Sequence, residues 1–184
     1  MRIIRFSELE TIPWKNGGGV TREIAAVREN ENIIWRLSIA DVASDGPFSS
    51  FVGLTRILTV IEGNGIKLTS TDRTIEAALG APVKFDGGQA IDSKLIDGPI
   101  CDLNVMFDPK RCHADVILLK APDHLKLQAN STQNIAIVGL EGETLVERKH
   151  PLRFGDTALM ETGSILLDFT EKASALIVTL NLLD

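Results

Sequence analysis

Short apolar runs, each closed by turn-forming residues, constrain the fold of this chain more than any other feature of its sequence. Three clear examples are residues 33–40, 57–61 and 135–138, which are followed by turn residues at 44–47, 62–65 and 139–142. Runs of four to eight residues bounded by Gly, Asn and Asp are typical of β-strands, whereas a helix needs a longer stretch with a 3.6-residue period. The sequence therefore predicts an all-β fold with little helix, limited to a turn or two at residues 7–11 with Ser7 as the N-cap.

Composition and charge narrow the class of protein. The 184 residues include 19 basic and 25 acidic side chains, and the net charge of −6 has the wrong sign for a nucleic-acid surface. No apolar run reaches the ~20 residues of a membrane span, and the chain starts on a polar, charged segment that does not resemble a signal peptide. Two cysteines, Cys101 and Cys112, are too few for a disulfide scaffold. We therefore expect a cytoplasmic protein that contacts neither nucleic acid nor membrane.

Two parts of the chain share a sequence pattern. Residues 60–65 (VIEGNG) resemble 138–143 (VGLEGE), and residues 82–87 (PVKFDG) resemble 151–156 (PLRFGD). The pattern predicts two jelly-roll β-barrels in one chain, at residues 1–110 and 111–184, joined by a linker near residues 110–115. It also places Phe85 and Phe154 at equivalent, buried positions. The alternative is chance similarity between glycine-rich turns.

The order of these elements resembles the cupin fold, and five motifs make the resemblance more specific. They are residues 14–24 (WKNGGGVTREI), 35–40 (WRLSIA), 45–49 (DGPFS), 51–53 (FVG, followed by Arg56) and 102–106 (DLNVM). Together they resemble the HutD/Ves family of bicupins over most of residues 12–107, while the second half matches only as a divergent cupin. The resemblance implies two fused cupin-type barrels in a cytosolic protein linked to histidine utilisation, as in HutD members, or to stress responses, as in Ves members.

Metal and nucleophilic chemistry find no support in the residue pattern. Cupins usually hold a metal with a closely spaced histidine pair, a glutamate and a later histidine, but His113, His124 and His150 form no such pair. Cys112 precedes His113 directly, and neighbouring strand residues point to opposite faces, so the two make a poor catalytic pair. We predict no catalytic residue, no metal ligand and no cofactor. Elemental analysis of dialysed protein should find no stoichiometric zinc, manganese, iron or nickel, and one metal ion per chain would contradict this prediction.

A run of three glycines follows Trp14, Lys15 and Asn16. Glycines let backbone N–H groups approach a ligand closely, so this segment is a candidate for anion binding, with a flat indole wall and a positive charge beside it. The alternatives are a plain turn or bulge before a strand at residues 21–27, and a Trp14 that anchors the N-terminus in the core. The segment matches neither GxGxxG nor a P-loop, which argues against a nucleotide site.

Alternation along two predicted strands supplies the other candidates. Arg36 and Ser38 share one face of the first strand, and Asp102 and Asn104 share one face of the second. Such a polar face is turned either to solvent or into the barrel, and both alternatives stay open. Turned inward, the four side chains would line a pocket for a small polar metabolite, with Arg36 and Asp102 paired when no ligand is bound.

Three functions remain. The first is a metal-free bicupin that binds a small polar or anionic metabolite and acts in regulation, without catalysis. The family resemblance makes a formylglutamate-like anion its candidate ligand, with Lys15, Arg22 or Arg36 as charged contacts. The second is an isomerase or hydrolase that acts on a related metabolite, and the third is a structural or interaction protein with no small-molecule site. Whether the chain forms a homodimer is left open.

Overall fold

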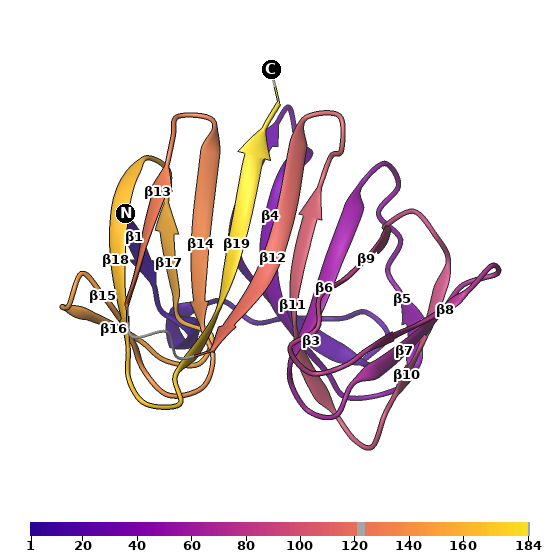
Figure 1. The fold of residues 1–184 in the computed structure, drawn as a ribbon. Coiled ribbons are helices and arrows are strands. Elements are labelled where there is room, and N and C mark those ends of the chain that lie inside the picture. The colour runs from indigo at the N-terminus through magenta and orange to yellow at the C-terminus, as the bar shows by residue number, and fades with distance from the viewer. Residues whose placement is uncertain (121–123, 184) are drawn as a thin grey trace. The chain divides into compact units, whose positions relative to one another are not determined.

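The computed structural model describes residues 1–120 and 124–183, which form two compact units made almost entirely of β-strands (Figure 1). The first unit, residues 10–111, is called here the N-terminal barrel. The second, called the C-terminal barrel, contains the described residues from 112 onward together with residues 1–9. No helix in the described part of the chain is long and apolar enough to cross a membrane.

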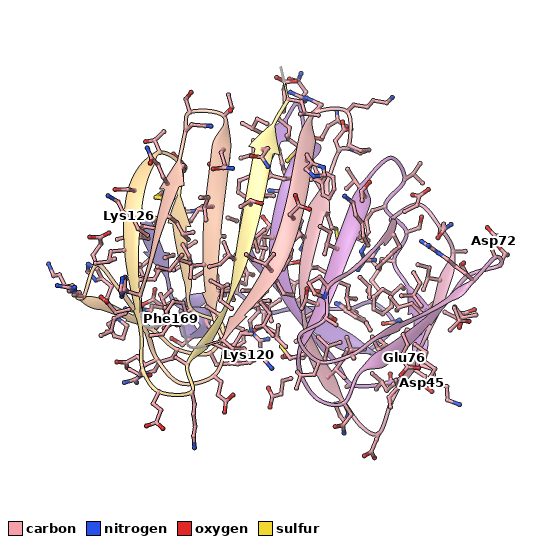
Figure 2. All side chains as sticks on the ribbon, viewed as in Figure 1. Asp45, Asp72, Glu76, Lys120, Lys126 and Phe169 are labelled. Carbon is pink, nitrogen blue, oxygen red and sulfur yellow. The ribbon has the colours of Figure 1, made fainter. Side chains whose placement is uncertain are left out.

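The N-terminal barrel consists of two antiparallel sheets. One has the strand order β2-β3-β4-β11-β6-β9 and the other β5-β10-β7-β8. The strands are β2 (Ile12–Pro13), β3 (Gly19–Glu29), β4 (Asn32–Val42), β5 (Gly46–Phe48), β6 (Thr55–Glu62), β7 (Ile66–Thr69), β8 (Thr74–Ala77), β9 (Val83–Asp86), β10 (Ile91–Leu95) and β11 (Ile100–Phe107). Leu58 of β6, Leu68 of β7 and Ile91 of β10 pack in one core cluster, so both sheets contribute to it. Asp72 and Glu76 lie on the solvent side of the β7–β8 hairpin (Figure 2).

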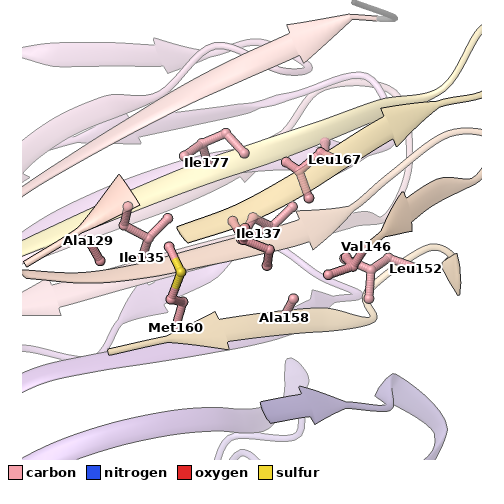
Figure 3. Close-up of a cluster of buried hydrophobic side chains, with 11 residues drawn as sticks. Ala129, Ile135, Ile137, Val146, Leu152, Ala158, Met160, Leu167 and Ile177 are labelled. Atoms are coloured by element: carbon pink, nitrogen blue, oxygen red, sulfur yellow. The ribbon is translucent and has the colours of Figure 1, made fainter. Parts of the chain in front are cut away.

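The C-terminal barrel has the same plan. Its sheets have the orders β1-β17-β14-β19-β12 and β13-β18-β15-β16. The elements are β1 (Arg2–Ile4), the 3-10 helix η1 (Phe6–Glu8), β12 (Cys112–Lys120), β13 (His124–Ala129), β14 (Gln133–Gly139), β15 (Thr144–Val146), β16 (His150–Leu152), β17 (Thr157–Met160), β18 (Gly163–Phe169) and β19 (Ser174–Leu182). Ile137, Met160, Leu167 and Ile177 fill its core (Figure 3). Each large apolar side chain buried in this way contributes about 1.5–3 kcal/mol.

The two barrels share one connectivity, in which each strand from β4 to β11 of the first barrel corresponds to the strand eight places later in the second. The order β4-β11-β6-β9 becomes β12-β19-β14-β17, and β5-β10-β7-β8 becomes β13-β18-β15-β16. The two glycine turns that suggested a repeat, at residues 63–65 and 140–143, connect β6 to β7 and β14 to β15, which are corresponding strands. The fold is two fused jelly-roll barrels of the cupin type.

The second repeated motif does not occupy equivalent positions, so that prediction is wrong. Phe85 lies within β9 and is buried, whereas Phe154 lies in the turn before β17, the strand that corresponds to β9. Phe154 is half-buried and packs edge-on against Phe6, with 5.9 Å between ring centroids. The phenylalanine of the PxxF motif thus lies in a strand in one barrel and in a turn in the other. The two segments share residue types but not a structural position.

The N-terminal segment and the connection between barrels also differ from expectation. Residues 1–9 were predicted in the first half, but β1 pairs with β17 and belongs to the second unit. The expected helix at residues 7–11 is the three-residue η1, whose N-cap is Arg5 and which has no side-chain cap from Ser7. The expected linker near residues 110–115 is largely strand, because β12 begins at Cys112. A turn closed by Arg111 N–H donating to the Asp108 carbonyl, at 3.0 Å, precedes it.

Asp156 fixes the N-terminal segment to the C-terminal barrel. Its carboxylate accepts hydrogen bonds from the Arg5 guanidinium at 2.7 Å and from the Phe6 N–H at 3.0 Å. Asp156→Ala should therefore lower the free energy of unfolding of this barrel by about 1.5–3 kcal/mol, the range for hydrogen bonds to charged groups. Urea unfolding followed by far-UV circular dichroism checks this, with the exposed Asp115→Ala as the control. Equal midpoints for the two variants would contradict the assigned role.

Candidate functional site

β4 and β11 bring the four polar strand positions together inside the N-terminal barrel. In their antiparallel register Ser38 lies directly opposite Asn104, and directly opposed residues point to the same face of a sheet. Arg36 and Asp102 follow on that same face at the next alternate positions. Ser38, Asp102 and Asn104 are all buried. The structure thus turns the polar face of these strands inward, away from solvent.

These side chains surround a cavity of about 60 Å³. This volume is large enough for ordered water or for one end of a small molecule. Its walls are Trp14, Thr21, Arg36, Ser38, Ala40, Phe48, Ser49, Phe51, Arg56, Asp102, Asn104 and Met106.

Arg56 of β6 is a buried cation that lines the cavity, and it is only 4% exposed. Its guanidinium donates to Asn104 Oδ1 at 2.7 Å and to the Ser49 carbonyl at 3.3 Å. The rings of Phe48, Phe51 and Phe85 lie around it, with centroids 5.1–5.5 Å from Cζ. Burial lowers the pKa of Arg56 to about 10, so the side chain is still charged at neutral pH.

Asp102 lies beside this cation and is completely buried. Its Oδ1 accepts a hydrogen bond from the side-chain amide of Asn104. Burial raises the pKa of Asp102 to about 7; the positive charge of Arg56 opposes this rise, and the carboxylate of Asp41 adds to it. Asn104 therefore connects a guanidinium to a carboxyl group that is half-protonated near neutral pH.

Arg36 does not pair with Asp102, so the predicted ion pair is wrong. Arg36 Nε donates instead to Glu23 Oε2 of β3 at 2.7 Å, and Arg28 also contacts Glu23, at 2.7 Å. The hydrogen bond from Arg28 lowers the pKa of Glu23 against the effect of burial, and Arg36 adds to the lowering. A bulge in β3 leaves Ile24 without a partner on β4, and Glu23 lies at its start.

Trp14, Lys15 and Asn16 lie at the outer side of the cavity. Trp14 lines it directly, donates its indole N–H to Thr21 Oγ1 at 2.7 Å and packs edge-on against Phe48. Lys15 and Asn16 line a second, more open pocket of about 530 Å³, which shares Trp14, Phe48 and Ser49 with the cavity. The two spaces therefore have a common wall and form an inner and an outer pocket.

The glycines after Asn16 shape a turn. Gly17 has φ +72°, and Asn16 Oδ1 accepts from the Gly18 N–H at 3.0 Å, so the asparagine side chain closes the turn. A Cβ on Gly19 would lie 2.3 Å from the Asp41 carbonyl oxygen, and no side chain fits there. The segment therefore forms a turn before β3, as one of the alternatives predicted. Gly19 lets β3 lie close to β4 and to Trp14.

Arg22 is the predicted site residue that the structure places elsewhere. It does not line the cavity, and its guanidinium binds Asp41 Oδ2 at 2.6 Å. Thr21 lines the cavity, and Arg22 as its neighbour in β3 points to the opposite face. Conversely, the sequence predictions omitted Arg56 and the three phenylalanines around it. One sequence feature could have indicated Arg56: it shares a strand face with Leu58 and Val60, in a strand whose other residues are mostly typical of a core.

The C-terminal barrel has a core cluster of hydrophobic side chains. It also has an open pocket of about 440 Å³, which is lined by Arg5, Phe6, Ser7, Pro151, Arg153, Phe154 and Asp156. Within residues 1–120 and 124–183, no three side chains of the His, Cys, Asp and Glu types gather in a way that could hold a metal ion.

Two jelly-roll barrels of the cupin type in one chain define a bicupin. The chain belongs to the HutD family, whose family model matches residues 6–177. A cupin-2 conserved barrel protein of Leptotrichia buccalis shares the fold at 12% identity, with a TM-score of 0.58.

Similar proteins include members from Pseudomonas and Escherichia. A Pseudomonas putida protein described as an uncharacterized 21.2 kDa protein in the hutC 3′ region is 36% identical over 117 residues, 62% of each chain. Protein Ves of Escherichia fergusonii is 37% identical over 108 residues, 56% of each chain. The match thus spans only 56–62% of the length of these curated relatives. The crystal structure of HutD from Pseudomonas fluorescens SBW25 is 29% identical, covers 100% of this chain and 99% of its own, and superposes with a TM-score of 0.85.

Proposed function

We propose that the protein binds a small polar or anionic metabolite in its N-terminal barrel and acts in the regulation of amino-acid utilisation. The observation that carries this proposal is Arg56, a charged group held inside a barrel next to Asp102 and Asn104. Burying a guanidinium and a carboxyl group is costly, and hydrophobic packing alone does not require it. A polar cavity with a perturbed titratable group is typical of a ligand site.

The names of relatives support histidine utilisation as the process. One relative lies in the hutC region of Pseudomonas putida, and the Pseudomonas fluorescens structure is named HutD. A formylglutamate-like anion is accordingly the first candidate ligand. The inner cavity would hold its head near Arg56 and Arg36, and the outer pocket would hold the rest near Lys15. The proposal includes a cytoplasmic location and no nucleic-acid or membrane partner.

A thermal-shift screen with breakdown products of amino acids, N-formylglutamate among them, tests this function. A ligand that binds only the folded state at 100 times its Kd adds about 2.7 kcal/mol of stability and so raises the melting temperature. Both tryptophans, Trp14 and Trp35, lie in the N-terminal barrel, so tryptophan fluorescence reports on the relevant unit. A panel in which no compound moves the fluorescence-detected transition would contradict the proposal.

Arg36→Ala should weaken binding of any anionic compound found in this screen by about 1.5–3 kcal/mol, because it removes a charge-assisted hydrogen-bond donor from the cavity wall. Isothermal titration calorimetry of variant and parent measures the change in Kd. Arg28→Ala is the matched control, since Arg28 also contacts Glu23 but does not line the cavity. An unchanged Kd in Arg36→Ala would remove Arg36 from the site.

An isomerase or hydrolase is the second candidate function, and one observation favours it. Asp102 has a pKa of about 7, and a carboxyl group that titrates near neutral pH can act as a general acid or base. NMR spectra of each stabilising compound after prolonged incubation with the protein decide between the two functions. New product signals would identify an enzyme, and unchanged spectra would leave binding alone.

A further inference from the structure

Glu23 of β3 lies beside the cavity and contacts one of its charged walls. In the antiparallel register of β3 and β4 it lies directly opposite Ser38, so the two side chains leave the sheet on the face that forms the cavity. Arg36, two residues from Ser38 on β4, lies on the same face. Glu23 Oε2 accepts from Arg36 Nε at 2.7 Å, and the Arg36 side chain is only 14% exposed. Glu23 thus holds the guanidinium by the nitrogen nearest the main chain.

The far end of the Arg36 guanidinium lies at the cavity. Its Nη1 is 4.0 Å from Met106 Sδ, and both residues line the cavity wall. Because a guanidinium is a planar fork, a partner on Nε leaves the two Nη groups to make the paired hydrogen bonds that a carboxylate accepts. Arg56, another cation of the wall, donates from both of its Nη groups to protein oxygens, those of Asn104 and Ser49. Arg36 is therefore the better placed of the two to contact a ligand with its Nη groups.

A carboxylate beside a site for anions requires an explanation, because its charge repels the ligand. One explanation is that Glu23 balances the charge of Arg36, and the other is that it fixes the orientation of Arg36. Arg28 already balances Glu23, since its two Nη groups contact both carboxylate oxygens, at 3.1 and 2.7 Å, from a side chain that is 41% exposed. A long side chain loses rotamer freedom when a ligand immobilises it, and a partner that has already fixed it removes this cost. The single bond to Arg36 Nε therefore favours the second explanation.

We propose that Glu23 is a positioning residue, which holds Arg36 with its Nη groups toward the cavity before a ligand binds. This inference rests on the proposed function, since it concerns the same site. Glu23 does not line the cavity itself, so it acts on the ligand only through Arg36. The ligand class that follows is a molecule with a carboxylate group, whose two oxygens can lie in the plane of the guanidinium and accept from both Nη groups.

Propionate, a small carboxylate, tests the inference on the whole chain at neutral pH, with binding followed by amide NMR shifts of cavity residues. Glu23→Gln keeps an oxygen for Arg36 Nε but has no charge, Glu23→Asp keeps the charge but is one methylene shorter, and Glu23→Ala keeps neither. We expect Glu23→Ala and Glu23→Asp to bind propionate about two- to tenfold more weakly than the parent, the cost of immobilising one long side chain. Glu23→Gln should bind it at least as tightly as the parent. Glu29→Gln, at a position of the same strand that is 60% exposed, is the control and should match the parent.

A charge effect alone predicts a different order, in which both uncharged variants bind propionate more tightly and Glu23→Asp matches the parent. That order, or equal binding by Glu23→Ala and Glu23→Gln, would overturn the inference and leave the proposed site intact. A parent protein in which propionate shifts no cavity resonance would also overturn it, and the metabolite screen then decides the proposed function separately. Melting curves show whether each variant is folded. Should Glu23→Ala be unfolded, the comparison of Glu23→Asp with Glu23→Gln decides the question.

Discussion

Asp102→Asn should raise the free energy of unfolding of the N-terminal barrel by about 4 kcal/mol at pH 8, and by less than about 1 kcal/mol at pH 4. Burial raises the pKa of this carboxyl group from the ordinary 3.8 to about 7 in the folded protein. Between these values the folded chain holds a proton that the unfolded chain has released. The stability of the parent therefore falls as the pH rises through this window and stays low above it, whereas asparagine does not ionise.

Urea unfolding of the variant and the parent at both pH values measures the difference in the free energy of unfolding. Tryptophan fluorescence follows the N-terminal barrel, because both tryptophans lie in it. Asp92→Asn makes the same chemical change at an exposed position and should leave the free energy of unfolding unchanged within about 0.5 kcal/mol. A gain that does not depend on pH, or a loss of stability at pH 8, would contradict the assignment of Asp102 as a buried, destabilised carboxylate.

Phe85→Ala should lower the free energy of unfolding of the N-terminal barrel by about 3–5 kcal/mol, the usual cost of removing a buried phenyl ring. Phe85 is 3% exposed, packs in the core cluster of this barrel and lies 5.2 Å from the Arg56 guanidinium. Its loss removes core contacts and one of the three rings around the buried cation. Fluorescence-detected urea unfolding measures the change.

Phe154→Ala is the natural comparison, because the two phenylalanines occupy the same place in a shared sequence motif. Phe154 lies half-buried in a turn, so its loss should cost the C-terminal barrel only about 1–2 kcal/mol, as measured by circular dichroism. Equal costs at the two positions would show that the motif is structurally equivalent after all.

The strand pattern of the sequence was sufficient to predict the fold. It also predicted a polar face on two strands, which could be turned either to solvent or into the barrel. Period-2 alternation placed Arg36 with Ser38 and Asp102 with Asn104, and these pairs do line one cavity. Alternation does not say whether a polar face meets solvent or an interior, because that depends on which sheets pack together. The antiparallel register between β4 and β11 puts the two pairs on one face, and the packing of the two sheets turns that face inward.

The sequence alone could not predict which side chains contact Arg36 and Arg56. Arg36 pairs with Glu23 because β3 lies beside β4 and carries a bulge, and a bulge has no sequence signature of its own here. Arg56 was named only as part of a motif and not as a site residue. Arginine side chains are mostly exposed, so a lone arginine in a strand does not by itself indicate a buried site. Its three phenylalanines come from β5, the loop after it and β9, and only the folded barrel brings them together.

The equal connectivity of the two barrels has a consequence for how this chain can change over generations. A single barrel must satisfy two conflicting demands, since a polar hollow for ligands weakens the packing that keeps the barrel folded. Here the copies differ: Ile137, Met160 and Ile177 pack in the core cluster of the C-terminal barrel, while Arg56 and Asp102 line a cavity in the N-terminal barrel. Substitutions that increase stability should therefore collect in the C-terminal barrel, and substitutions that alter recognition should collect around the cavity of the N-terminal barrel. On the function proposed here, a lineage built on this plan can exchange its ligand while the C-terminal barrel stays unchanged.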